Sequence, residues 1–244
     1  MNISSLNIKI IVGTIYIATL SIGLYFLFST VDIKDLMSYD FIRENKDIIL
    51  KYKNENFLFL TFVFFIFISI WVLFLGFVIP ILLLSGFVFG KWWGILIGVT
   101  STTMGATLLY LLCLYFFKDF IREKLEPKFF TLKEFFNKND TLYFTIFRLS
   151  GGLGAPFSIQ NVLPVLFNMP IKNYAIATFI GSVPAMFVTV SLGSGIENVI
   201  DKNSTVSLST IFYSPEIYIP IFIFFVILFI GYLLKKFILK RKKI

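Results

Sequence analysis

The sequence contains no histidine and a single cysteine, Cys113. Without histidine, the chain cannot use imidazole catalysis, a serine–histidine dyad or a histidine-based zinc site. One cysteine cannot form an internal disulfide or a metal cluster, and Cys113 lies in an apolar run where it serves as a small filler. We therefore expect no catalytic residue, no metal site and no cofactor.

Charged residues are also scarce. They make up 15% of the chain, against about a quarter in soluble domains, whereas 57% is hydrophobic and the mean hydropathy is +0.87. The net charge of +8 does not indicate nucleic-acid binding, because six basic residues are concentrated in the last ten positions, 235–244. A basic cluster after an apolar segment is the positive-inside pattern. We expect a multi-pass protein of the cell membrane with a cytoplasmic C-terminus.

Uncharged stretches divide the chain into candidate membrane helices. The sequence predicts an all-α integral membrane protein with about five transmembrane helices, at 10–31, 57–75, 92–117, 174–192 and 217–234. The first lies in an N-terminal segment, 1–31. Residues 32–56 are densely charged, with apolar residues near one helical face, which predicts an amphipathic interfacial helix.

Two apolar segments are interrupted by proline and glycine. Residues 57–90 would reach roughly 50 Å as one helix, against a hydrocarbon core of about 30 Å, and Pro80, Gly86 and Gly90 break them. Residues 149–171 are interrupted more heavily still. Irregular backbone at membrane depth must be buried in protein or line a wet cavity. We therefore expect two re-entrant helical hairpins, at 80–90 and 143–168.

Counting basic residues gives an expected topology. Residues 32–56 contain five basic residues, and residues 118–138 contain six. With the tail inside and two opposed re-entrant hairpins, both segments fall in the cytoplasm and the N-terminus falls outside. Two hairpins that enter from opposite faces, each followed by a span, are the arrangement of an inverted repeat.

Over residues 70–196 the chain resembles the DedA-like VTT-domain family, also called the SNARE-associated Golgi protein family. One motif runs from Pro80 to Gly86-Phe-Val-Phe-Gly90; the second comprises Arg148, Pro156, Asn161 and Gly181-Ser-Val-Pro184. The resemblance implies a membrane protein with two facing re-entrant hairpins. It also implies a link to lipid scrambling or to recycling of a polyprenyl phosphate carrier.

The chain departs from the transporter-like members of that family. It has no acidic residue between Phe57 and Phe117, where those members carry carboxylates, and Leu114 stands where an arginine is expected. A proton-coupled transporter needs an intramembrane group that carries the proton. The departures therefore disfavour proton coupling and leave passive lipid movement open.

Arg148 is the candidate site residue, since it is the only charge between Thr141 and Ile171. A buried guanidinium needs an anion or carbonyl groups, and its planar fork suits a lipid phosphate. Two alternatives stay open: Arg148 caps backbone carbonyls of the broken hairpin, or it snorkels to the interface. The expected substrate-binding set is Arg148, Pro80, Gly86, Gly90, Pro156, Asn161, Gly181 and Pro184.

The expected function is the movement of lipids through a groove formed by the two hairpins, with a phospholipid or a polyprenyl phosphate as substrate. The expected partners are membrane lipids, with their phosphate headgroups as the contact, and the sequence is compatible with a homo-oligomer. The alternatives are a small-solute or ion transporter, and a structural or assembly role. The sequence lacks the catalytic residues of an intramembrane protease, because the expected spans contain neither histidine nor a carboxylate.

Overall fold

The computed structural model describes residues 39–74 and 78–202 continuously, together with scattered helical positions within 11–29 and 215–233. Within these ranges the elements are α-helices and short 3-10 helices, with no strand. The predicted all-α class is therefore confirmed. The basic tail and most of the predicted first and last spans lie outside the described residues.

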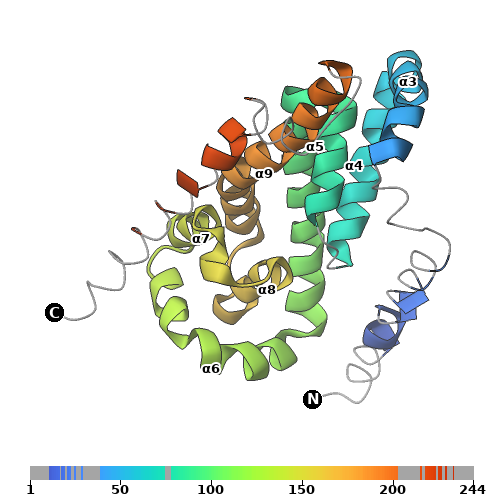
Figure 1. Ribbon diagram of the computed structural model, residues 1–244. Coiled ribbons are helices and arrows are strands. Elements are labelled where there is room, and N and C mark those ends of the chain that lie inside the picture. The colour runs from blue at the N-terminus through green and yellow to red at the C-terminus, as the bar shows by residue number, and fades with distance from the viewer. Residues whose placement is uncertain are drawn as a thin grey trace.

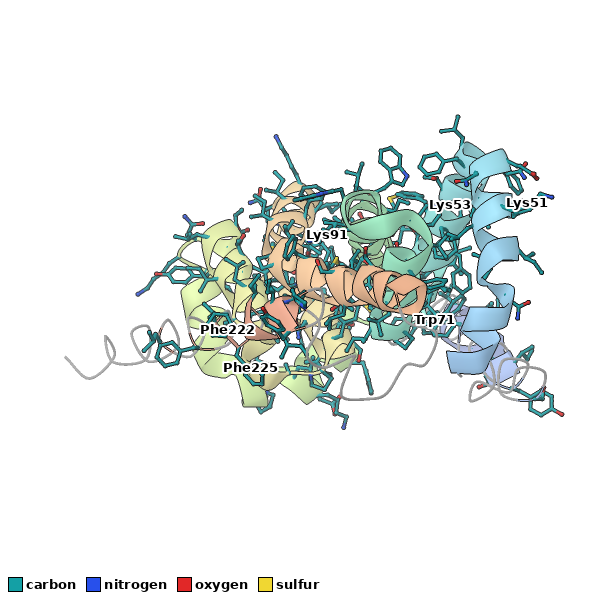
Figure 2. The ribbon with its side chains drawn as sticks, turned by 45° about the horizontal axis from the view of Figure 1, so that its top comes forward. Lys51, Lys53, Trp71, Lys91, Phe222 and Phe225 are labelled. Atoms are coloured by element: carbon teal, nitrogen blue, oxygen red, sulfur yellow. The ribbon has the colours of Figure 1, made fainter. Side chains whose placement is uncertain are left out.

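The amphipathic segment forms α3 (Tyr39–Glu55), which is followed by the apolar helix α4 (Phe57–Leu73). The end of α3, from Ile48, and α4 are bent by 105° at the break between them. If α4 follows the membrane normal, α3 therefore lies close to the membrane plane, as expected for an interfacial helix. Lys51 and Lys53 project from α3 (Figure 2).

Helix α5 (Val78–Phe116) consists of two limbs that meet at Gly90, whose φ of 75° and ψ of 177° are non-helical. The Ser85 hydroxyl donates to the carbonyl of Gly94 at 3.3 Å, and a Cβ built on Gly98 would lie 2.7 Å from the Leu82 side chain. In a straight helix, residues nine apart would be separated by about 13 Å. The limbs 78–89 and 91–116 are therefore antiparallel.

Helix α4 runs parallel to the second of these limbs. The Trp93 indole donates to the Thr61 hydroxyl at 3.2 Å, the Ser69 hydroxyl donates to the Ser101 carbonyl at 3.1 Å, and further along Gly105 abuts Ser69. Consequently α4 and limb 78–89 form a hairpin that returns to the end of the molecule where α4 began. The segment predicted as a hairpin by itself, 80–90, is only the returning limb.

The second broken segment follows α6 (Lys118–Phe136). It consists of α7 (Asp140–Leu149), the 3-10 turn η1 (Gly151–Gly154), α8 (Phe157–Val162) and the 3-10 helix η2 (Leu163–Phe167). Gly151, Gly152 and Gly154 have positive φ, a conformation that glycine adopts without steric cost. Helix α7 has 10 residues, so it is about 15 Å long, half the thickness of a hydrocarbon core.

Helix α9 (Ile171–Lys202) runs antiparallel to limb 91–116. The Tyr174 hydroxyl bonds to Ala106 near one end, and Val190 lies against Gly94 and Gly98 near the other. Helix α9 extends past the predicted end of this span at Leu192. The α5–α9 pair forms the centre of the molecule, with α4 on one side and α7 on the other (Figure 1).

Among the described residues, Val78–Phe116 and Ile171–Gly195 are long and apolar enough to cross a membrane, and the bent α3–α4 pair raises the number to three if it counts as one span. Since α5 reverses at Gly90, its limb 91–116 is the part that can cross. These helices correspond to the predicted spans 92–117 and 174–192. The predicted span 57–75 corresponds to α4, which is a hairpin limb.

The two basic segments lie at opposite ends of the molecule. Figure 1 shows α3 at one end and α6 at the other. Helix α3 ends just before Phe57, which contacts Trp93 at the start of limb 91–116. Helix α6 begins directly after the other end of that limb. The expectation that both segments share one side is therefore corrected. The expected arrangement had α4 end on the other side, whereas limb 78–89 returns the chain to the end where α4 began.

A candidate anion site at Arg148

Arg148 lies in the last turn of α7 and is 5% exposed. Helix α7 runs parallel to α9, because the Asn173 amide donates to the Asp140 carboxylate at 3.0 Å and Arg148 lies against Gly181. A Cβ built on Gly181 would lie 2.5 Å from the Cβ of Arg148. Gly181 is therefore the residue that allows the arginine to pack against the middle of α9.

The guanidinium links three helices. Nη2 of Arg148 donates to Oδ1 of Asn161 on α8 at 2.6 Å and to the Tyr174 hydroxyl on α9 at 3.3 Å. The Tyr174 hydroxyl in turn donates to the carbonyl of Ala106 on α5 at 3.2 Å. This chain of hydrogen bonds fixes the α7–α8 hairpin to both crossing helices.

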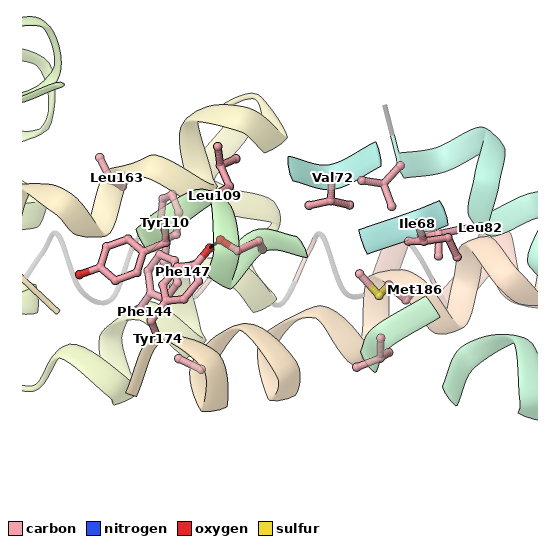
Figure 3. Close-up of a cluster of buried hydrophobic side chains, with 14 of the residues drawn as sticks. Ile68, Val72, Leu82, Leu109, Tyr110, Phe144, Phe147, Leu163, Tyr174 and Met186 are labelled. Carbon is pink, nitrogen blue, oxygen red and sulfur yellow. Dashed lines mark hydrogen bonds between the residues drawn. The ribbon is translucent and has the colours of Figure 1, made fainter. Parts of the chain in front are cut away.

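Aromatic rings surround the charge. The guanidinium carbon lies 5.1 Å from the Phe144 ring centre and 5.7 Å from that of Phe157, within cation–π range. Phe144 stacks on Tyr174 at 5.5 Å, and Tyr174 stacks on Tyr110 at 4.5 Å. Figure 3 shows these three rings gathered in the buried core. The rings stabilise a cation without neutralising it.

The site leaves hydrogen-bonding capacity unused. Among the described residues, Nε of Arg148 and Nδ2 of Asn161 are buried and have no hydrogen-bond partner. The side chains that contact the guanidinium, Asn161, Tyr174, Phe144 and Phe157, carry no negative charge. Buried polar groups are rarely left unpaired, and buried charges rarely lack a counter-charge. The arrangement can therefore accept an anion that contacts both nitrogens.

The two alternative interpretations of Arg148 do not describe its geometry. Its hydrogen bonds go to side chains on α8 and α9 and not to carbonyls of the broken hairpin. Its burial, at the level of Gly181 on α9, is incompatible with a side chain that reaches the interface.

The structure brings some of the predicted site residues together. Asn161 and Gly181 both contact Arg148. Pro156 is the N-cap of α8, five positions before Asn161, and Pro184 lies inside α9 one turn beyond Gly181. Asn161 and Gly181 thus contact Arg148, and the two prolines lie near them along the chain.

The other predicted residues, Pro80, Gly86 and Gly90, belong to α5, and no contact within the described part of the chain joins them to Arg148. A Cβ built on Gly86 would lie 2.0 Å from the carbonyl oxygen of Val190, which is nine residues and therefore about 13 Å beyond Gly181. Pro80 is exposed in the first turn of α5, and Gly90 has open space around it. Gly86 allows the close crossing of limb 78–89 over α9, and Gly90 allows the reversal.

Sequence reasoning missed Tyr174, Phe144 and Phe157. A signal existed for Phe144, because Asp140, Phe144 and Arg148 are spaced four residues apart and so share one face of α7. Tyr174 is 26 positions from Arg148, and no local pattern connects the two.

Comparison with known proteins identifies the domain. Residues 78–195 match the family model of the VTT domain. This protein contains a VTT domain. The matched range holds both limbs of α5, the α7–α8 hairpin and the membrane-crossing part of α9. The resemblance to the DedA-like VTT-domain family is thereby confirmed.

Two relatives share this region. A transmembrane protein 41 homolog of Dictyostelium discoideum is 31% identical over 131 residues, which cover 52% of this chain and 39% of the relative. The uncharacterized protein YqeD of Bacillus subtilis is 31% identical over 113 residues, or 46% of this chain and 53% of the relative. The chain thus aligns with about half or less of each relative's length. No solved structure matches it.

Proposed function

We propose that this VTT-domain protein moves lipids between the two leaflets of a membrane, with a phospholipid or a polyprenyl phosphate as substrate, and that Arg148 binds the lipid phosphate. The observation that carries the proposal is a buried arginine with neutral partners and an unpaired Nε. Burying such a charge in a membrane is costly. An anion that arrives with the substrate supplies the missing counter-charge.

The arrangement of helices supports a pair of opposed hairpins. In the first, α4 and limb 78–89 lead into the crossing helix 91–116; in the second, α7 and α8–η2 lead into the crossing helix α9. The first limb runs parallel to the crossing helix in each case. The two crossing helices are antiparallel to each other, as in an inverted repeat.

Arg148 lies at a depth that suits headgroup passage. Gly181, its neighbour on α9, is ten residues from the start of the candidate span Ile171–Gly195 and 14 from its end. These separations correspond to about 15 and 21 Å. A headgroup crossing a core of about 30 Å meets its highest barrier near this depth, so a phosphate-binding side chain there lowers the barrier where it is largest.

We propose an orientation that is compatible with this arrangement and that replaces the expected outside position of the N-terminus. Gly13 and Tyr16 lie close to Phe117, at the end that carries α6, and α3 lies at the opposite end. We place the α6 end, with its six basic residues, in the cytoplasm. By the same rule we propose that Lys9 and the basic tail, 235–244, which lie outside the described residues, are also cytoplasmic. Both termini then lie inside, and α3 lies outside the cell.

A transporter for ions or small solutes is less well supported. Residues 57–116 contain one charged residue, Lys91, and no carboxylate, whereas ion pathways and proton relays are lined by ionisable groups. Arg148 is the one charged residue within 141–171, and it matches a single phosphate better than a conduction path.

Reconstitution tests the proposal. The purified protein is placed in liposomes that contain a trace of fluorescent phospholipid, and a membrane-impermeant quencher reports the fraction that reaches the outer leaflet. We expect quenching beyond that of protein-free liposomes, without leakage of an entrapped dye. Dye or ion flux in the absence of lipid movement would favour the transporter alternative, and the absence of both would contradict the proposal.

A further inference from the structure

We infer that the Arg148 site is built for a singly charged phosphate, so that the substrate is a phosphodiester lipid and not a phosphomonoester such as polyprenyl phosphate. This inference rests on the proposed function. It narrows the substrate class from the charges and donors that surround the arginine.

The first support is the charge of the site. Arg148 contributes one positive charge, and its hydrogen-bond partners Asn161 and Tyr174 are neutral. A phosphodiester carries one negative charge, so its complex with Arg148 is neutral as a whole. A phosphomonoester carries up to two negative charges near neutral pH, and the described side chains that contact the guanidinium, Asn161, Tyr174, Phe144 and Phe157, supply no second positive charge. Excess charge buried in a low-dielectric site strongly disfavours binding.

The second support is the number of unused donors. Among the described residues of the site, two nitrogens are buried without a partner, Nε of Arg148 and Nδ2 of Asn161. They belong to side chains that are already hydrogen-bonded to each other, so they are neighbours. A phosphodiester has two non-bridging oxygens, so each of these buried nitrogens can donate to one of them.

Competition between two lipids tests the inference. A fluorescent phosphatidylglycerol is bound to the purified protein in detergent, and unlabelled phosphatidylglycerol or phosphatidic acid with the same acyl chains displaces it. At about pH 8 phosphatidic acid is largely a dianion, and at about pH 5 it is a monoanion. We expect it to compete about tenfold more weakly than phosphatidylglycerol at the higher pH, and nearly equally at the lower pH.

Between pH 5 and 8 the change in charge is expected on the lipid and not on the protein. The chain has no histidine, the side chain whose ordinary pKa lies between pH 5 and 8. The titratable groups that face the site are Tyr174 on α9, with Tyr110 and the buried Cys113 of α5 behind it, and Asp140 on α7, while α8 supplies the neutral Asn161. Repeating the competition with Asp140→Asn controls for that carboxylate, and the pH effect should persist.

The outcomes separate this inference from the proposed function. If phosphatidic acid competes as well as phosphatidylglycerol at the higher pH, or if the pH effect disappears in Asp140→Asn, the site does not select a single charge and the inference is wrong. If Arg148→Leu binds the fluorescent lipid as tightly as the wild type, the proposed site itself is wrong. Displacement by an equal concentration of inorganic phosphate would show that the site takes a small free anion and would overturn its assignment to a lipid.

Discussion

Arg148 shows how far single residues can be predicted from this sequence. It is conspicuous because it is the one charge in a long apolar stretch, and a guanidinium in such a place needs partners. The partners themselves could not be predicted. Asn161 and Tyr174 are 13 and 26 positions away, and only the reversal after α7 and the packing of α9 bring them to the guanidinium.

Replacement of Asn161 by aspartate distinguishes an anion site from a purely structural arginine. In Asn161→Asp, a carboxylate takes the position of Oδ1, 2.6 Å from Nη2 of Arg148, and forms a buried ion pair. We expect a folded protein, because the buried guanidinium keeps a hydrogen-bond partner at this position and gains a counter-charge. Lipid movement should be lost, because the introduced carboxylate then pairs with Arg148 in place of a lipid phosphate. Liposome assays and thermal unfolding provide the two measurements.

Asn161→Leu is the matched variant that removes the hydrogen bond without adding charge. It should lower the unfolding midpoint, since a hydrogen bond to a charged group contributes about 1.5–3 kcal/mol. Full lipid movement by a well-folded Asn161→Asp would show that Arg148 is structural.

At the scale of elements, glycine and proline predicted where the chain breaks but not which limbs pair. The breaks at Gly90 and at 151–156 were expected from composition. The role of α4 was not, because an apolar helix of 17 residues reads equally well as a short span or as a hairpin limb. Contacts such as Thr61 with Trp93, 32 positions apart, decide between them.

Gly90→Ala tests the reversal that joins the two limbs of α5. The φ of 75° and ψ of 177° lie in a region that is essentially restricted to glycine, although no atom lies within 4 Å of a Cβ built there. The variant should therefore lose about 1–3 kcal/mol of stability through backbone strain alone. In a regular helix the same change would stabilise by up to about 1 kcal/mol.

Leu84→Ala, an exposed position on the same limb, is the control for Gly90→Ala and should change stability by no more than about 0.5 kcal/mol. The unfolding midpoints of the two variants in detergent are compared with that of the wild type. An unchanged or raised midpoint for Gly90→Ala would mean that α5 continues through this position without reversing.

For the whole molecule, the sequence predicted helices and membrane insertion better than topology. Apolar length identifies the crossing segments 91–116 and 171–195, whereas the positive-inside count depends on how many segments cross. Helices α3 and α6 lie at opposite ends of limb 91–116. If this limb crosses the membrane, as its length and composition allow, the basic residues of α3 and those of α6 lie on opposite sides. The six acidic residues in 32–56 do not explain why a segment with five basic residues would lie outside, because acidic residues contribute little to orientation.

Cysteine labelling tests this topology. In a Cys113→Ala background, Lys51→Cys places a thiol on the exposed surface of α3, and Lys124→Cys places one on α6, where the lysine side chain is 60% exposed. A membrane-impermeant maleimide added to intact cells should label Lys51→Cys and leave Lys124→Cys unlabelled until the membrane is permeabilised. Equal protection of both thiols would restore the arrangement expected from residue counting and contradict the structure.

The central claim is that Arg148 moves lipid by binding its phosphate, and lipid movement in liposomes by Arg148 variants tests it most directly. Arg148→Leu should abolish the movement, whereas Arg148→Lys should retain a reduced rate because the charge remains but the planar fork is lost. Lys172→Leu, which removes the same charge from an exposed position, should match the wild type. If Arg148→Leu is folded and moves lipid at the wild-type rate, the claim is wrong.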